Sequence, residues 1–258
     1  MKIKAPVLLA IAFLGIWAAF YFGFDVSSVD HKRANEIRKQ DLLITGIENI
    51  KMAADARLQE PQKAELKELM LSLQNSKTTL EKIESLKRIS GFWFRSGEYE
   101  LAGSSLEDIA KEQGTAEAWN DAGMNYFEGL NKLEDEKRRI FCFQSAEKAF
   151  QNAHSLDSKN PEHQLYQALC YVKVPGEEPM KGILMLRDLE SKFPDYLPIQ
   201  LNLVRLAIQT NQWDRAKSRL ETILEKEKSN AEANCLMVEV LSQTNQLEKI
   251  EEFKKFCK

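Results

Sequence analysis

Four cysteines are the residues best suited to redox or metal chemistry, and their spacing matches neither. They are Cys142, Cys170, Cys235 and Cys257. No two of them form a C-x-x-C motif, the spacing that brings two sulfurs together in redox enzymes and zinc sites. We therefore expect four free thiols, buried or partly buried in the fold, with a disulfide framework as the alternative.

The histidines and acidic residues form no catalytic or metal-binding pattern. His31, His154 and His163 are far apart in the sequence and are not placed beside the cysteines. A di-iron site in a helical protein needs Glu-x-x-His pairs, whereas Glu162 directly precedes His163. The acidic clusters at 134–136 and 225–227 lie among Lys and Arg residues, which is typical of solvated helix faces. Phosphate-binding and nucleophile motifs are absent, so we expect no enzyme, no cofactor and no metal site.

The composition predicts an all-α fold. The chain has 258 residues, of which 43% are hydrophobic and 29% charged, with only 11 glycines and 7 prolines. Leu, Glu, Lys, Ala and Gln are good helix formers, and long runs of alternating Val, Ile and Thr are absent. The formal net charge of −3 provides no general attraction to phosphate backbones, so we expect no nucleic-acid partner.

An uncharged segment near the start of the sequence predicts a membrane anchor. Residues 5–24 read APVLLAIAFLGIWAAFYFGF. At about 1.5 Å of rise per residue, a helix of this length crosses a hydrocarbon core of about 30 Å. A cleaved signal peptide is the alternative, but its apolar core is usually shorter and no small-x-small cleavage site precedes Asp25. We therefore expect a retained single-pass anchor in the inner (plasma) membrane.

The charges on either side of this segment bear on its orientation. Lys2 and Lys4 precede it and favour an orientation with the N-terminus inside the cell. Four positive residues follow at 32–39 and favour the reverse, as do cysteines expected to be unpaired. We expect the soluble body to be periplasmic or otherwise extracytoplasmic.

An internal repeat is the most informative feature of the sequence. Residues 209–216 read QTNQWDRA and residues 243–250 read QTNQLEKI, an offset of 34 residues. Thirty-four residues is the period of a helix–turn–helix unit of the tetratricopeptide type. Asn211 and Asn245 fall in the predicted turns, where a residue that tolerates left-handed backbone geometry is needed.

A second set of motifs occurs upstream. Trp119-x2-Ala122-Gly123-x2-Tyr126 resembles the W-x2-L-G-x2-Y signature of a first repeat helix, and Ala146-x3-Phe150 resembles the A-x3-F of the second. With the 34-residue offset, these motifs make the chain similar to members of the tetratricopeptide repeat (TPR) family. The resemblance implies an α-solenoid of about five units with a right-handed superhelix, the last unit being degenerate or a cap.

The sequence divides into three predicted parts. They are the anchor at 1–24, a linker with a helical flanking segment at 25–78, and the repeat domain at 79–258. In the flanking segment, Ile50, Ala54 and Leu58 share a helical stripe with Ile37, Ile44 and Ile47, and Pro61 starts the next helix. We expect this pair of helices to pack on the first repeat, with a coiled-coil dimer as the alternative.

Two departures from the repeat length are visible. The second unit carries 11 extra residues, which we place between Glu128 and Phe143. A longer turn is expected at 175–179, which reads PGEEP.

The resemblance implies both packing positions and a binding groove. Repeat-defining packing is expected at Trp119, Gly123, Tyr126, Ala146, Phe150 and Ala216. Trp119 is expected to be buried, so that its replacement by alanine would cost about 3–5 kcal/mol. The groove is expected on non-consensus positions of the first helices, at Asn120, Met124, Phe127, Leu165, Leu169, Leu201, Arg205 and Ile208. Arg205 alone does not make the Lys/Arg/Asn clamp with which some TPR domains hold a C-terminal carboxylate.

These expectations favour a binding function over catalysis. The leading interpretation is a membrane-tethered protein-interaction scaffold that aids assembly or recruitment of an envelope complex, with a peptide or helix of a partner protein in its groove. The alternative is an accessory subunit of a cofactor or cytochrome maturation system, which would position a catalytic partner.

Overall fold

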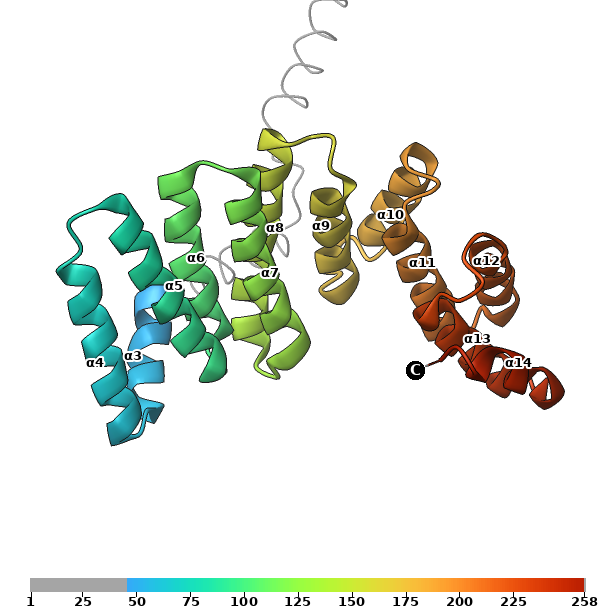
Figure 1. Ribbon diagram of the computed structural model, residues 1–258, viewed down its shortest axis with the longest axis horizontal. Coiled ribbons are helices and arrows are strands. Elements are labelled where there is room, and N and C mark those ends of the chain that lie inside the picture. The colour runs from blue at the N-terminus through green and yellow to red at the C-terminus, as the bar shows by residue number, and fades with distance from the viewer. Residues whose placement is uncertain (1–45, 258) are drawn as a thin grey trace, which may run out of the picture. The chain divides into compact units, whose positions relative to one another are not determined.

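Helices account for all of the regular structure in the part of the chain described. The computed structural model describes residues 46–257, which contain twelve α-helices and one short 3-10 helix, with no strand among them (Figure 1). The predicted span at 5–24, and Ile37 and Ile44 of the predicted stripe, lie outside these residues. Within 46–257, every helix is too short or too polar to cross a membrane.

The helices follow one another with short connections. Their bounds are α3 (Ile47–Arg57), α4 (Glu60–Gln74), α5 (Thr79–Arg95), α6 (Tyr99–Gln113), α7 (Ala116–Lys132), α8 (Glu136–Leu156), α9 (Pro161–Lys173), α10 (Lys181–Lys192), α11 (Leu197–Gln209), α12 (Trp213–Lys226), α13 (Ala231–Gln243), η1 (Leu247–Lys249) and α14 (Ile250–Lys254).

Local sequence signals explain where many of these helices begin. The Thr78 side chain accepts a hydrogen bond from the Glu81 backbone N–H, and the Glu81 carboxylate accepts one from the Thr78 N–H, which forms a capping box for α5. Asn160 and Asn230 cap α9 and α13 through their side-chain oxygens, which accept hydrogen bonds from the backbone N–H groups of Glu162 and Ala233. Pro61 lies in the first turn of α4, as the sequence predicts.

The helices pack in pairs along the array. In each pair a first helix, here called the A helix (α5, α7, α9, α11 or α13), packs against the B helix that follows it (α6, α8, α10, α12 or α14). The B helices α6, α8, α10 and α12 also contact the A helix of the next pair, and Figure 1 shows the pairs following one another. The predicted flanking helices pack on the first pair, α3 on α6 and α4 on α5.

The turns between A and B helices confirm the predicted repeat register. Asn211 and Asn245 have positive φ values of 56° and 57°, and both occupy the turn that follows an A helix. Gly97 occupies the equivalent turn after α5, with φ of 74°. These three residues adopt the left-handed conformation that glycine and asparagine tolerate best. The copies at 209–216 and 243–250 therefore hold equivalent places in the fold.

The extra residues of the second unit lengthen its helices. The α7 helix has 17 residues and α8 has 21, with only 133–135 between them. The predicted longer turn at 175–179 lies in the connection between α9 and α10.

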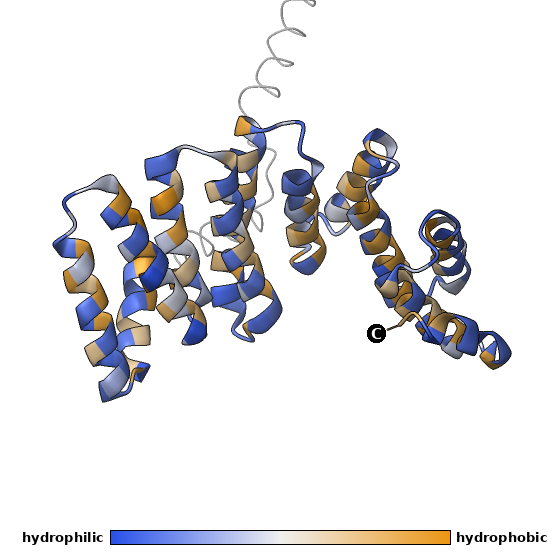
Figure 2. Ribbon diagram, viewed as in Figure 1, coloured by the Kyte–Doolittle hydropathy of each residue, from blue (hydrophilic) through white to orange (hydrophobic). Residues whose placement is uncertain are grey.

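Small residues allow the long α7 and α8 helices to pack closely. A Cβ on Gly123 would lie 2.6 Å from the Phe150 ring, so only glycine admits this aromatic side chain. Phe150 and Ala146 are 0% exposed and Tyr126 is 1% exposed. Figure 2 shows hydrophobic and hydrophilic residues together on the helices, as amphipathic packing requires.

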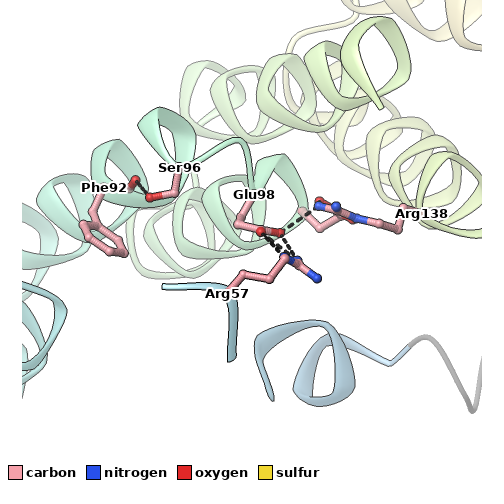
Figure 3. Close-up of polar contacts among 6 residues, drawn as sticks. Arg57, Phe92, Ser96, Glu98 and Arg138 are labelled. Atoms are coloured by element: carbon pink, nitrogen blue, oxygen red, sulfur yellow. Dashed lines mark hydrogen bonds and ion pairs between the residues drawn. The ribbon is translucent and has the colours of Figure 1, made fainter. Parts of the chain in front are cut away.

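A charged network ties α3 to the first two pairs (Figure 3). The Arg57 guanidinium donates three hydrogen bonds to Glu98, of 2.7, 2.8 and 3.1 Å. Arg138 donates to Glu98 at 2.8 Å and to Glu100 at 2.7 Å, and the Glu100 side chain is fully buried. Two carboxylates and two guanidiniums therefore meet where α3, the α5–α6 turn and the start of α8 come together.

The expectation of four free thiols is wrong for two of them. Cys235 and Cys257 form a disulfide with a Cα–Cα separation of 4.7 Å. Their sequence separation of 22 residues contains a turn and two short helices, which fold the chain back so that the sulfurs meet. Cys142 and Cys170 are free and buried, as expected.

Candidate partner-binding face

The structure places half of the predicted groove residues inside the fold. Phe127, Leu165, Leu201 and Ile208 are only 2–9% exposed and belong to clusters of the hydrophobic core. The prediction that they line an open groove is wrong, because neighbouring helices cover them. The spacing along a helix identifies the side of an A helix, but the position of the next helix decides which of those residues stay accessible.

The other four predicted residues keep some access to solvent. Asn120, Met124 and Leu169 are partly exposed, and Arg205 is exposed. They come from α7, α9 and α11, which are three consecutive A helices. We call these four residues the A-helix face.

An aromatic group beneath this face was not predicted. The Tyr166 ring meets Phe127 edge-on, with centroids 5.4 Å apart, and stacks on Phe150 at 5.5 Å. Burial, with a contribution from the Glu162 carboxylate, raises the pKa of Tyr166. The Lys173 ammonium lies 5.8 Å from the centre of the Phe127 ring. Tyr166 directly follows the predicted groove residue Leu165, so a prediction that included the neighbouring position would have found it.

Arg205 links two A helices at the surface. Its guanidinium forms an ion pair with Glu232 of α13, and it also donates a hydrogen bond of 3.3 Å to Asn202. Both side chains of the ion pair are 43% exposed, so solvent screens it and its contribution to stability is small. A charged partner can therefore compete for either side chain.

Asn120 also joins two A helices. Its side-chain oxygen lies 3.1 Å from Nδ1 of His163, which is 3% exposed. Because that oxygen is an acceptor, Nδ1 carries the proton and donates. Burial lowers the pKa of His163, which favours the neutral ring. Nε2 of His163 is buried and has no hydrogen-bond partner in the described structure. Asn120 therefore serves α7–α9 packing as well as the surface.

The predicted packing positions are buried with one exception. Gly123, Tyr126, Ala146, Phe150 and Ala216 all lie in the core. Trp119 is only partly buried, which corrects the expectation that it fills the space between helices. Its replacement by alanine would therefore leave a smaller cavity than full burial implies.

Three hollows lie beside the first A helix, α5, and two of them share a lining residue. One of these two, of about 310 Å³, lies between α4 and α5, and the other, of about 300 Å³, lies between α5, α6 and α7. Lys87 lines both. In the first hollow, Arg95 is paired with Glu65 at 2.9 Å. Lys87 precedes the turn residue Gly97 by as many residues as Leu201 precedes the turn residue Asn211. Lys87 of α5 is therefore the repeat counterpart of Leu201 of α11.

A protein-family model matches part of this arrangement. Residues 182–237 match the tetratricopeptide repeat model, and they cover α10, α11, α12 and the first half of α13. This part of the chain is therefore similar to the tetratricopeptide repeat (TPR) family. A and B helices alternate here, with left-handed turn residues after α5, α11 and α13, and TPR arrays mediate protein–protein interactions.

Comparisons with whole proteins add little about this TPR array. No curated protein matches the chain. Two solved structures of monomeric IFIT1 mutants, one with Gppp-AAAA and one with m7Gppp-AAAA in the anti conformation of the cap, are each 15% identical with a TM-score of 0.41. The match covers 77% of this chain and 51% of theirs, so the chain spans about half the length of those structures.

The described residues offer no alternative site for metal chemistry. Among residues 46–257, no group of three or more His, Cys, Asp or Glu side chains is arranged to hold a metal ion.

Proposed function

We propose that this TPR protein is a membrane-tethered scaffold whose A-helix face binds another protein. The observation that carries the proposal is the placement of Met124, Leu169 and Arg205 on three consecutive A helices, with solvent access above a closed core. A surface held by packed helices is pre-organised, which lowers the entropy lost on binding.

The chemistry of this face fits a peptide or an amphipathic helix. Met124 and Leu169 offer apolar contacts, and methionine adapts its shape to different partners. Arg205 and Glu232 offer both signs of charge at one edge of the same surface. A helix or extended segment with apolar residues at regular spacing and flanking charges complements this arrangement.

The tether and its orientation are part of the same proposal. Residues 5–24 would span the inner (plasma) membrane once, with the TPR body outside the cytoplasm and the repeats wound into a right-handed superhelix. The Cys235–Cys257 disulfide supports this orientation, because disulfides persist in oxidising compartments and are rare in the cytosol. In that place the chain would recruit or help assemble an envelope complex.

Cross-linking of the full-length chain tests the binding face. The chain would be cross-linked in its native membrane, extracted in detergent and analysed by mass spectrometry. Cross-links from α7, α9 and α11 to a second protein are expected. They should decrease at least about tenfold in Arg205→Glu if Arg205 contributes about 1.4 kcal/mol or more to the binding free energy.

A matched control separates lost binding from lost structure. Lys226→Glu also breaks an exposed ion pair, with Asp195 at 2.6 Å, but it lies on the B helix α12. Equal loss of cross-links in both variants, or cross-links confined to B helices, would refute the assigned face. Recovery of oxidoreductase components as the partners would favour a maturation-system subunit over an assembly scaffold.

A further inference from the structure

The final helix of the described array is too short to be stable by itself. The α14 helix spans five residues, Ile250–Lys254, and none of them is fully buried. Isolated helices of this length do not persist in water. Its apolar contacts come from Ile250 and Phe253, which pack against the cluster that includes Met237 and Leu241. Something besides helix propensity must therefore keep α14 in place.

The Cys235–Cys257 disulfide is located where it can hold α14 against α13. Cys235 lies on α13, 34 residues after Leu201 of α11, so the two residues are repeat counterparts. Leu201 is 6% exposed within its packed cluster, whereas Cys235 is partly exposed. Within the described residues no A helix follows α13, and the segment after α14 returns to α13 instead. Cys257 meets Cys235 there and closes a loop that contains η1 and α14.

The two pairs of cysteines differ in their access to reagents. Cys235 and Cys257 are both partly exposed. Cys142 and Cys170 are 0% exposed, and burial raises the pKa of each thiol, which keeps them protonated and unreactive. A dithiol in solution therefore has one accessible target among the four cysteines.

We propose that the Cys235–Cys257 bond is a redox-controlled clasp that holds residues 247–257 on the last A helix. Reduction releases this segment and exposes the apolar side of α13 that α14 covers. The clasp is independent of which protein binds the A-helix face, so it goes beyond the proposed scaffold function.

The chemistry is thiol–disulfide exchange with a dithiol reductant. A thiolate of the reductant attacks one sulfur of the disulfide and forms a mixed disulfide, and the other cysteine leaves as a thiolate that takes up a proton. The second thiol of the reductant then attacks the reductant's first sulfur, which is bonded to a protein cysteine in the mixed disulfide. This attack closes a disulfide within the reductant and displaces the protein cysteine as a thiolate. Two electrons pass to the protein, which ends with two thiols, while the reductant ends as a disulfide.

The released surface is defined by the packing of α13. Met237, Val240 and Leu241 are at most 1% exposed in the clasped state, and Ile250 and Phe253 help to cover their cluster. Because α13 also packs against α11 and α12, it keeps its place when α14 leaves. The change is therefore confined to one end of the array.

Hydrogen–deuterium exchange of the full chain in detergent micelles tests the clasp. The oxidised protein would be compared with the same protein in dithiothreitol and after reoxidation. Exchange within 247–257 should become at least about tenfold faster on reduction, return on reoxidation, and stay unchanged in α5–α8. The Cys235→Ser/Cys257→Ser variant should behave as the reduced protein and show no further change in dithiothreitol.

Three results would overturn the proposal. Alkylation of the denatured, unreduced protein should modify only Cys142 and Cys170, so modification of all four cysteines would show that the bond does not form. Unchanged exchange of 247–257 after reduction would show that the bond holds nothing in place. Loss of protection throughout residues 47–257 of the reduced wild-type chain would show that the effect is global, and this readout remains available if the double-serine variant does not fold.

Discussion

The two ends of the described helical array are held by different kinds of interaction. At one end, α3 and α4 cover the first pair with apolar residues, and Arg57 of α3 and Arg138 of α8 both form ion pairs with Glu98. At the other end, a five-residue helix is held by two partly buried apolar side chains and a disulfide. Long amphipathic helices bury enough surface to stay in place by packing, whereas a short helix needs a covalent link to keep its position.

The largest effect is expected from the buried part of the charged network. In Arg138→Met, the fully buried Glu100 carboxylate loses its guanidinium, which should cost about 3–5 kcal/mol of unfolding free energy. Chemical denaturation measures this loss. Arg219→Met is the matched control, since its ion pair with Glu190 is 26–30% exposed and should contribute about 1 kcal/mol or less. Equal losses in the two variants would contradict a special role for the buried network.

Removal of the disulfide tests the opposite end. For a 22-residue separation, the loss in the Cys235→Ser/Cys257→Ser variant should be about 3 kcal/mol on the chain-entropy scale. The melting temperature, measured without reductant, should fall accordingly. A melting temperature equal to that of the wild-type chain would show that packing alone holds this end, and the contrast between the ends would disappear.

A smaller effect is expected from the exposed part of the charged network. The Arg57 side chain is 51% exposed, so Arg57→Gln should cost only about 0.5–1 kcal/mol. This cost should decrease with added salt, because exposed charges are screened. Denaturation at low and high ionic strength makes the comparison. A cost that does not depend on salt would mean that Arg57 acts through packing.

The smallest effect concerns a group between the two ends. Burial lowers the pKa of His163, so the unfolded chain binds more protons than the folded one near the ordinary histidine pKa. Stability from this residue is therefore complete above that pKa and decreases as the pH falls through it. Unfolding free energies at pH 8 and pH 5.5 should differ more in the wild-type chain than in His163→Gln. If the unfolding free energy depends on pH equally in the two proteins, His163 does not contribute to the pH dependence of stability.

Much of the fold could be predicted because it depends on local rules. The left-handed turns at Asn211 and Asn245, the helix start at Pro61 and the Gly123–Phe150 contact all follow from short-range sequence patterns. Each of these features restricts its position to one or a few residue types, and for that reason it is visible in the sequence.

The features that could not be predicted depend on how distant segments meet. Phe127 and Leu201 are buried by helices from neighbouring pairs. The spacing of residues within one helix does not show which neighbouring helix packs over them. Arg57, Glu98 and Arg138 come together across separations of about 40 residues, as the packing of α3 and α8 determines. The disulfide likewise depends on a chain reversal after α14 that no spacing motif announces.

The closeness of α9 and α10 has a consequence for how this sequence can diverge. A Cβ on Gly182 would lie 2.6 Å from the Ala168 carbonyl oxygen and 2.7 Å from the Val172 nitrogen, both of them backbone atoms. A side chain can rotate away from a new methyl group, but the backbone of a packed helix cannot. Any homologue that keeps the α9–α10 hairpin should therefore retain glycine at position 182, whereas exposed neighbours such as Leu184 can be replaced. Glycine at this position is then a marker for recognising remote homologues.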